Sequence, residues 1–372
     1  MMSKRRLFVV RRNFGGAGGA ERVAADYARR IDGNWESTLV HAGSAGSGIP
    51  IGGNIGPSWF RMLKFTGDVD RFCKKVSPAC VFSLERGPLC DVFRAGDGTH
   101  RRWIRIKYSN LTSWMFNPSN WVNLSLERRS ITLSRVIIAN SQMVASDLQN
   151  EYPNIDRSKI RVIRNGFDPN RFHLGSSNAL ESIGLPMDAK TFLFLGSGWQ
   201  RKGLDFAMSF FAAVIQTDKV YRKHGYLLVA GDGDVSPYLA KADQLGIKSR
   251  VIFLGLIAEP ANFCRASVLM VLPTQYDPFS NASLEALACG CPVFTTSSNG
   301  AAEVIDHGRT GLVFDHLHKI HPSLVAREFL ETTFTSRENI AESVSCMTRE
   351  IEISHYLELF EEILEMKKST DG

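Results

Sequence analysis

Residues 276–293 read YDPFSNASLEALACGCPV, and this stretch carries the most specific chemical signal in the chain. Two acids, Asp277 and Glu285, stand eight positions apart across a turn that leads into an apolar helical pattern. Backbone amides at a helix start bind anions, and carboxylates accept hydrogen bonds from hydroxyl groups. We therefore expect both acids to contact a bound ligand.

The polar turn between the two acids is expected to take part in the same contact. Backbone amides around Phe279, Ser280 and Asn281 would face an anion at the start of the helix. Helix capping is the alternative role for Glu285. With Asn281 as the cap, however, Glu285 comes one residue too late for a capping box.

Outward from this stretch, short apolar runs alternate with longer helical patterns, which predicts an α/β fold with doubly wound parallel sheets. Strands are expected in the first half at 5–11, 80–85, 135–141 and 161–164, and in the second half at 191–196, 226–231, 251–254, 268–273, 293–296 and 312–314. Helices are expected between them, including 20–31, 204–217, 283–288 and 351–367.

The length of 372 residues favours two domains, because one hydrophobic core rarely organises so long a chain. The turn-rich stretch 164–169 is a plausible linker, so we divide the chain into Rossmann-like domains at 1–166 and 167–345. The final helix, within 346–372, is expected to pack back on the first domain. Two such domains facing across a cleft would present the loops that follow their strands, where parallel sheets bind ligands.

Two further loops of this kind carry glycine or cations. The first strand leads into a loop that contains Gly15, Gly16, Gly18 and Gly19, where the backbone can approach a ligand closely. Its spacing does not satisfy GxGxxG, which disfavours a dinucleotide cofactor. The second loop presents Gly198, Arg201 and Lys202, and its cations can neutralise a diphosphate. A tight turn and a solvated surface loop are the respective alternatives.

Composition excludes several classes of protein. Hydrophobic residues make up 44% and charged residues 22%, as in ordinary globular proteins. We expect no membrane-spanning helix, since no run approaches 18 strongly apolar residues, and no signal peptide, since the first apolar run has five residues. The seven cysteines contain no CxxC pair, so no structural zinc is expected. These features favour the cytosol.

Charge is distributed unevenly along the chain. Residues 1–166 hold 26 Lys and Arg against 13 Asp and Glu, while the remainder holds 18 against 25. The stretch 94–135 combines eight cations with Trp103, Trp114 and Trp121. Cations interleaved with tryptophan suit an anionic membrane surface. Nucleic acid and a plain solvated face are the alternatives, and nucleic acid is the least favoured.

Together these motifs resemble the retaining GT-B glycosyltransferases of family 4. The resemblance rests on the acid-x7-Glu spacing followed by Ala-Leu-Ala-Cys-Gly-Cys-Pro-Val, on the glycine-rich loop ending in Glu21-Arg22, and on Arg201-Lys202-Gly203. It extends over residues 10–315. Members usually have Glu where this chain has Asp277.

The resemblance implies a donor-binding second domain and an acceptor-binding first domain. Glu285 would hold the nucleotide ribose, and Asp277 would face the sugar hydroxyls. Arg201 and Lys202 would hold the diphosphate, which makes an essential metal or other cofactor unnecessary. Asp232-Gly233-Asp234 spells DxD, which we interpret as a plain loop near the base.

A narrower resemblance lies in residues 90–103, CDVFRAGDGTHRRW, which are similar to the lipopolysaccharide inner-core glucosyltransferases that add glucose to heptose. Those enzymes have an acid at the position of Asp97, which is the expected catalytic group; His100 is the competing candidate. The following surface would contact the acceptor and membrane. It comprises His100, Arg101, Arg102, Trp103, Arg105 and Lys107.

We therefore expect a retaining transferase at the cytoplasmic face of the inner membrane. It would move a hexose, first of all glucose from UDP-glucose, onto a lipid-linked saccharide such as lipopolysaccharide core heptose. A family 4 transferase of O-antigen or capsule synthesis and a GT-B epimerase are the enzymatic alternatives. A non-catalytic protein that binds membrane or RNA through its basic face is the alternative from another class.

Overall fold

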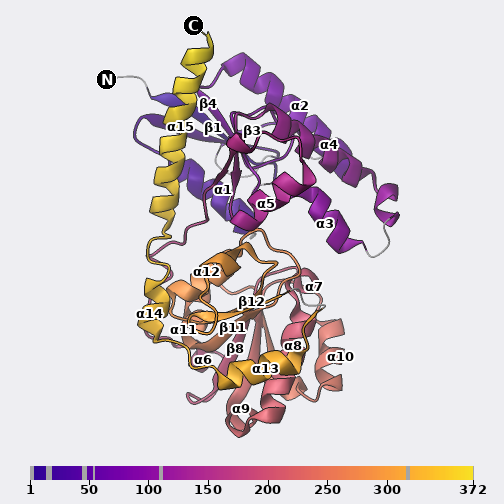
Figure 1. Cartoon of the computed structure of the whole chain (residues 1–372), viewed down its shortest axis with the longest axis vertical. Helices are drawn as coiled ribbons and strands as arrows, with labels where there is room; N and C mark the ends of the chain where they lie inside the picture. The colour runs from indigo at the N-terminus through magenta and orange to yellow at the C-terminus, as the bar shows by residue number, and fades with distance from the viewer. Residues whose placement is uncertain are drawn as a thin grey trace. The chain divides into compact units, whose positions relative to one another are not determined.

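The polypeptide folds into two units, each built around one parallel β-sheet (Figure 1). The computed structural model describes residues 4–13, 19–43, 48–52, 55–108, 112–315 and 319–371, apart from the side chains of 19–22, 370 and 371. The first unit comprises Met1–Arg164 and Glu350–Gly372, and the second comprises Asn165–Arg349. The predicted α/β class, with two doubly wound parallel sheets, is confirmed.

The first unit has a seven-stranded sheet in the order β3-β2-β1-β4-β5-β6-β7. Its strands are β1 (Arg5–Val10), β2 (Trp35–His41), β3 (Ile49–Pro50), β4 (Cys80–Ser83), β5 (Val92–Arg94), β6 (Val136–Ala139) and β7 (Ile160–Val162). Its helices are α1 (Gly19–Arg30), α2 (Ser58–Val76), α3 (His100–Lys107), α4 (Pro118–Leu133), α5 (Gln142–Glu151) and α15 (Arg349–Asp371), whose first residue belongs to the second unit.

The second unit has a six-stranded sheet in the order β10-β9-β8-β11-β12-β13. Its strands are β8 (Lys190–Leu195), β9 (Gly225–Ala230), β10 (Val251–Gly255), β11 (Ser267–Leu272), β12 (Val293–Thr296) and β13 (Gly311–Phe314). Its helices are α6 (Ala179–Ser182), α7 (Trp199–Lys202), α8 (Leu204–Thr217), α9 (Lys219–His224), α10 (Ser236–Gln244), α11 (Pro260–Ala266), α12 (Asn281–Ala288), α13 (Pro322–Glu331) and α14 (Arg337–Glu342).

Each sheet is covered on both faces, which explains why its central strands are apolar without alternation. In the second unit, Phe192 packs with Phe210 of α8 and Phe329 of α13, whereas Leu193 packs on the opposite side with the cluster around α11 and α12. In the first unit, α15 contributes Tyr356 and Phe360 to the cluster around α1 and β4.

The sequence missed three strands of the first sheet. In β2, the exposed or half-buried Glu36, Ser37 and Thr38 interrupt the apolar pattern, and β5 has only three residues and ends in Arg94. The two-residue β3 is too short to predict. The expected strands that do form differ from the observed ones mainly at their ends.

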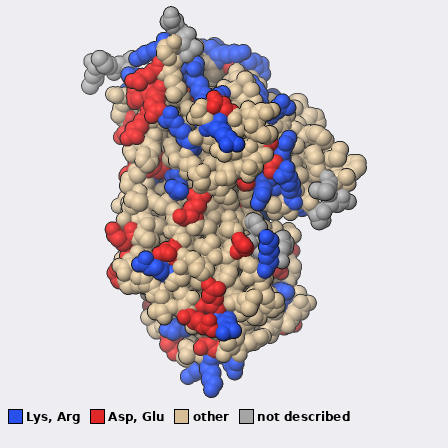
Figure 2. All heavy atoms as spheres, in the orientation of Figure 1, with Lys and Arg blue, Asp and Glu red and all other residues tan. Residues whose placement is uncertain are grey.

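The return of α15 changes the charge balance expected from the sequence. With Glu350–Gly372 included, the first unit holds 28 Lys and Arg against 20 Asp and Glu, and the second holds 16 against 18. Figure 2 shows cations gathered over the first unit beside acidic side chains along α15. The asymmetry between the units is therefore smaller than that between the two sequence segments.

The stretch 164–169 joins the two units, but its beginning is packed rather than loose. Asn165 and Phe167 are buried, and the backbone of Phe167 pairs with Thr348 in a parallel bridge. The Phe167 amide donates to Met347 O at 3.0 Å, and the Arg349 amide donates to Phe167 O at 2.7 Å. The two segments that lead out of the second unit are thus bonded to each other.

Among the residues that the structure describes, no helix combines the length and the apolar character needed to cross a bilayer.

Candidate active site

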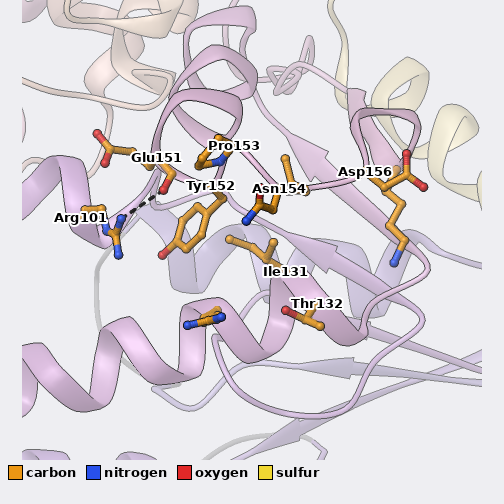
Figure 3. A pocket seen from close by; sticks show the side chains of 11 residues that line it. Arg101, Ile131, Thr132, Glu151, Tyr152, Pro153, Asn154 and Asp156 are labelled. Carbon is orange, nitrogen blue, oxygen red and sulfur yellow. Dashed lines mark hydrogen bonds between the residues drawn. The ribbon is translucent and has the colours of Figure 1, made fainter.

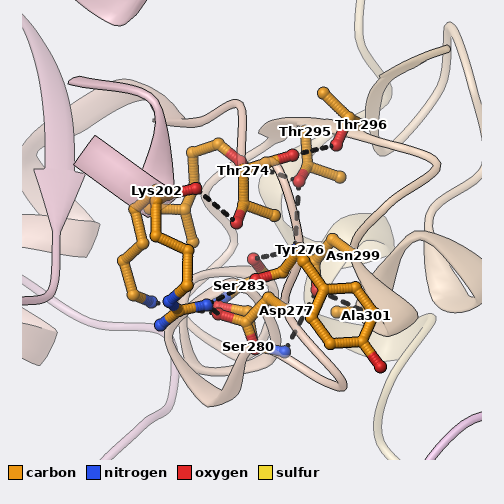
Figure 4. Close-up of polar contacts among 12 residues, drawn as sticks. Lys202, Thr274, Tyr276, Asp277, Ser280, Ser283, Thr295, Thr296, Asn299 and Ala301 are labelled. Atoms are coloured by element: carbon orange, nitrogen blue, oxygen red, sulfur yellow. Dashed lines mark hydrogen bonds and ion pairs between the residues drawn. The ribbon is translucent and has the colours of Figure 1, made fainter. Parts of the chain in front are cut away.

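Asp277 lies between two cations in the second unit (Figure 4). Its Oδ2 accepts hydrogen bonds from Arg201 Nη1 and Lys202 Nζ, each at 3.3 Å. The Asp277 and Lys202 side chains are each 11% exposed, and that of Arg201 is 31% exposed. Burial alone would raise the pKa of Asp277, but the charges of Lys202 and Arg201 outweigh it and hold the pKa below its usual value.

The topology of the second sheet explains why these three side chains meet. Arg201 and Lys202 follow β8, Asp277 follows β11, and these adjacent strands are where the strand order reverses. Ligands of open parallel sheets bind outside the carboxyl ends of strands at such a point. Arg201 O accepts from the Gln275 amide at 2.8 Å and from Thr274 Oγ1 at 3.1 Å, so the two loops are bonded together.

Asn299 holds the turn before α12 and was not among the residues predicted from the sequence. Its Oδ1 accepts from the amides of Ser280 at 3.1 Å and Ala301 at 3.0 Å. Its Nδ2 donates to Thr295 Oγ1 at 3.0 Å and to Ser283 Oγ at 3.3 Å. Asn299 lies three residues after β12, at the carboxyl end of a strand that the sequence predicts, and this position is the signal that points to it.

The remaining predicted donor-side residues surround α12 and α7. Ser280, not Asn281, is the N-cap of α12, and its side chain accepts from the Ser283 amide at 3.3 Å. Glu285 is therefore five positions after the cap, which removes the capping-box alternative. Asn281 Oδ1 accepts from Asn165 Nδ2 at 2.6 Å. Phe279 is a core side chain, which leaves only its backbone for a ligand.

Gly198 caps α7 at φ 75°, a left-handed conformation that glycine adopts without strain. Gly233 of the DxD sequence packs so closely on Trp199 that a Cβ would lie 2.6 Å from the ring. Within the described residues, no group of three or more His, Cys, Asp and Glu side chains is arranged to hold a metal ion.

Asp97 lies in the first unit at the turn between β5 and α3, and its side chain is 49% exposed. Its Oδ2 accepts from Arg11 Nη1 at 3.1 Å; Arg11 follows β1 and also donates to Leu84 O at 2.8 Å. Partial burial would raise the pKa of Asp97, but the guanidinium groups of Arg11 and Arg86 hold it below its usual value. Asp97 is thus an accessible carboxylate beside the reversal of strand order between β1 and β4.

The turn that carries Asp97 is fixed by a buried carboxylate, Glu127 of α4. Glu127 Oε2 accepts from the His100 amide at 2.6 Å and from Arg86 Nε at 2.9 Å. Arg86 Nη2 donates to Gly98 O at 2.8 Å. Neither Glu127 nor Arg86 was predicted from the sequence, because these residues stand 41 positions apart and meet only in the folded unit.

His100 has a different environment from Asp97. Its Nε2 is 3.1 Å from Asn120 Oδ1, and Asn120 is itself bonded to Trp114 O at 2.9 Å. Burial and the charge of Arg86 lower the pKa of His100, which favours the neutral ring. The competing catalytic candidate is therefore already engaged in a local hydrogen-bond network.

Three cations of the expected basic surface of α3 are engaged by α5, two of them with carboxylates. Arg105 pairs with Glu151, Arg102 Nε is 4.0 Å from Asp147 Oδ1, and Arg101 Nη1 donates to Glu151 O at 3.2 Å. Lys107 lies 5.5 Å from the ring centre of Tyr108, and Trp103 is half-buried. Arg105 thus has a carboxylate partner, although its side chain remains 58% exposed. The expected contact of this surface with an acceptor or a membrane stays a prediction.

Exposed apolar side chains lie beyond α3, in the 3₁₀ turn Ser113–Phe116 and at the start of α4. Phe116 is 87% exposed, and Met115 and Trp121 are each 48% exposed. The rings of Trp114 and Trp121 are 5.0 Å apart, and Trp121 Nε1 donates to Met115 O at 2.9 Å. We call Trp114, Met115, Phe116 and Trp121 the aromatic tip.

Of the four glycines predicted to contact the donor, only Gly19 lies within the described residues. Gly15, Gly16 and Gly18 lie outside the described residues, and Gly19 is the first residue of α1. Their expected contact with the donor stays a prediction.

Two Rossmann-like units with polar groups at both points of strand reversal define the GT-B architecture. A family model described as Glycosyltransferase Family 4 matches residues 17–171, and one described as Glycosyl transferases group 1 matches residues 189–321. The chain belongs to the family 4 glycosyltransferases.

Curated relatives match part of the chain. It is 32% identical over 167 residues to an uncharacterised glycosyltransferase of Methanocaldococcus jannaschii, covering 43% of this chain and 42% of the relative. It is also 32% identical over 184 residues to the D-inositol 3-phosphate glycosyltransferase of Mycolicibacterium smegmatis, covering 48% and 41%. The chain thus spans less than half the length of these two relatives.

Solved structures match over nearly the whole chain. WaaG, a glycosyltransferase involved in lipopolysaccharide biosynthesis, superposes with a TM-score of 0.74 at 18% identity, covering 97% of this chain and 99% of that one. Anabaena HepE in complex with UDP and glucose superposes at 0.71 and 17%, covering 95% and 98%. At these identities the likenesses establish the fold.

Proposed function

We propose that the chain is a retaining hexosyltransferase that uses a nucleotide-diphosphate sugar, with UDP-glucose as the first donor to test. The observation that carries the proposal is the pair of cations, Arg201 and Lys202, presented with Asp277 at the strand reversal of the second sheet. Anions bind at such loop ends, and two cations can stabilise the negative charge of a departing diphosphate. HepE, a relative in fold, was solved in complex with UDP-glucose.

In this proposal Asp277 faces the hydroxyls of the donor sugar, and Glu285 holds the ribose. Asp277 keeps the two cations in place in the free protein, and the diphosphate takes over part of their hydrogen bonding in the complex. Because two cations already supply the charge, the reaction is proposed to need no divalent metal.

On the acceptor side, Asp97 is proposed to receive the hydroxyl proton or to stabilise positive charge at the anomeric carbon. Its exposure and its depressed pKa keep it ionised and available at neutral pH. His100 is less suited to this role, because its ring is held by Asn120. The proposed acceptor is a lipid-linked saccharide, first of all a lipopolysaccharide core heptose.

The exposed side chains of the aromatic tip favour binding of the protein to a membrane surface. Exposed Trp and Phe side chains next to cations suit the interfacial region of an anionic bilayer. We propose peripheral binding at the cytoplasmic face of the inner membrane. Phe116→Ser with Trp121→Ser should reduce flotation with phosphatidylglycerol vesicles several-fold, while Met187→Ser, an exposed residue of the second unit, should not. Equal flotation of all three proteins would contradict the membrane proposal.

The enzymatic test is turnover of UDP-, GDP- and ADP-hexoses, with and without EDTA, on a deacylated core oligosaccharide. We expect EDTA-insensitive transfer from one UDP-hexose with retained anomeric configuration. Asp97→Asn should lower kcat by at least about a hundredfold with unchanged UDP affinity, as expected for loss of a proton-transfer group. Glu285→Gln should mainly weaken UDP binding. If no donor is consumed and calorimetry detects no nucleotide binding, the proposal fails.

A further inference from the structure

A pocket of about 440 Å³ opens in the first unit between α3, α4 and the segment that follows α5 (Figure 3). It belongs wholly to this unit and contains none of the residues assigned above to the donor or to proton transfer. Eight of its eleven lining residues are polar or charged, and three of these are cations. These are Arg101, Arg128 and Lys159.

The two acids of this pocket offset the charge of its three cations only in part. Arg101 Nη1 donates to the carbonyl of Glu151 at 3.2 Å, and Lys159 Nζ donates to the carbonyl of Ser134 at 3.2 Å. The Glu151 carboxylate pairs instead with Arg105, which is outside the lining. Asp156 Oδ1 accepts from the amide and hydroxyl of Ser158 at 3.0 and 2.7 Å. The lining therefore carries three cations against two carboxylates, and one of these carboxylates is paired with a cation outside the pocket.

Arg128 differs from Arg101, whose guanidinium already donates to Glu151 O and lies over the Tyr152 ring. It is exposed, and no carboxylate among the described residues pairs with it. An arginine fork with free donors binds phosphate in a bidentate manner. Figure 3 shows Thr132, Asn154 and the Tyr152 ring around the same hollow, which adds hydroxyl, amide and aromatic surface for a polyol.

We propose that this pocket binds a phosphate group carried on a polyol, held by Arg128 and Lys159 with Arg101 beside them. Two sources share this chemistry, a phosphorylated saccharide and an anionic lipid headgroup. The assignment to an acceptor saccharide rests on the proposed function, whereas the phosphate site itself does not.

The pocket is connected to the Asp97 turn by hydrogen bonds. The hydroxyl of Tyr152, a lining residue, donates to Glu127 Oε1 at 2.6 Å. Glu127 also holds the His100 amide and Arg86, which fix the turn that carries Asp97. A phosphate bound here would anchor an acceptor next to the element that bears the proposed catalytic carboxylate.

The test is calorimetric titration with glucose 6-phosphate and with inorganic phosphate, using full-length protein. An Arg201→Gln, Lys202→Gln background removes the other cation pair, so that remaining phosphate binding reports on the pocket. On this background Arg128→Gln and Lys159→Gln should each weaken binding of glucose 6-phosphate about tenfold, the effect of one charge-assisted hydrogen bond. Arg157→Gln, which changes an exposed cation outside the lining, should change it less than twofold.

The two sources are separated by sedimentation with phosphatidylglycerol and phosphatidylcholine vesicles. Loss of phosphatidylglycerol binding in the pocket variants, with unchanged glucose 6-phosphate affinity, assigns the site to a lipid headgroup. The opposite pattern assigns it to a saccharide phosphate. Pocket variants that match wild type in both assays overturn the proposal. Donor turnover is measured separately, so a failed transferase assay leaves the phosphate titration interpretable.

Discussion

At the scale of single residues, Asp277 couples the candidate donor site to stability. Its pKa is depressed by Lys202 and Arg201, so its ion pairs stabilise the fold above the unfolded pKa near 4 and lose that effect as pH falls through the lower folded value. Asp277→Asn should cost about 1–3 kcal/mol at pH 7. The free energy of unfolding of the variant should also decrease less than that of the wild type as the pH falls below about 4.

Urea unfolding at stepped pH would measure both effects of Asp277→Asn. Asp243→Asn, which removes an exposed ion pair with Lys248, is the matched control. It should leave the loss of stability below about pH 4 unchanged. A variant profile parallel to that of wild type would show that Asp277 does not carry this pH dependence.

Asn299 is expected to matter through the backbone that it holds. Asn299→Ala leaves the buried amides of Ser280 and Ala301 without their acceptor, at a cost of about 2–4 kcal/mol. UDP affinity should fall with stability, because the turn before α12 loosens. Asn299→Asp keeps an acceptor oxygen for the two amides, and should retain more of the stability and more of the UDP affinity than Asn299→Ala. Equal losses in Ala and Asp variants, measured by unfolding and UDP titration, would contradict this role.

The chemistry of the site was easier to predict than its supports. Asp277, Arg201 and Lys202 stand in short motifs whose residue types already suggest anion binding, and the structure brings them together. Arg11 and Glu127 carry no local signal, because each reaches its partner only when distant strands or helices pack. Local sequence therefore identifies groups that act on a ligand, whereas their positioning depends on topology.

At the scale of elements, Gly166 allows the two segments at the edge of the second unit to pair. A Cβ there would lie 2.3 Å from Thr348 O. Gly166→Ala should therefore destabilise the second unit by about 1–3 kcal/mol through overpacking. Gly175→Ala is the control, because its Cβ would meet nothing closer than 3.6 Å. Similar melting temperatures for the two variants would exclude a steric cause.

The same scale shows which elements a sequence pattern reveals. The strand 293–296 was predicted with its observed bounds, because four buried residues, three of them β-branched, form one uncharged run. The β2 strand was missed because polar residues occupy its middle, although its last three residues are buried. The β2 segment forms a strand because neighbouring strands bury its residues, and this burial cannot be predicted from the segment alone.

At the scale of the whole molecule, each unit has its own core, so calorimetry should resolve two unfolding transitions. Tyr356→Phe removes the hydroxyl that accepts from the buried Arg94 Nε at 3.1 Å. This change should lower the free energy of unfolding of the first unit by about 1–3 kcal/mol. Asn299→Ala should lower the second unit's transition, and UDP should raise it. A single transition shifted by both variants would contradict independent units.

The packing of α15 has a consequence for the order of events during synthesis. Tyr356 and Phe360 complete a cluster begun by Tyr27 and Phe82, so the first unit needs residues that leave the ribosome after the whole second unit. Domains fold as units while the chain grows. We expect the second unit to finish folding first. Until α15 is synthesised, the apolar side chains of Phe82 and its neighbours remain exposed to solvent. The segment translated first is thus the later one to become native and the one more dependent on chaperones.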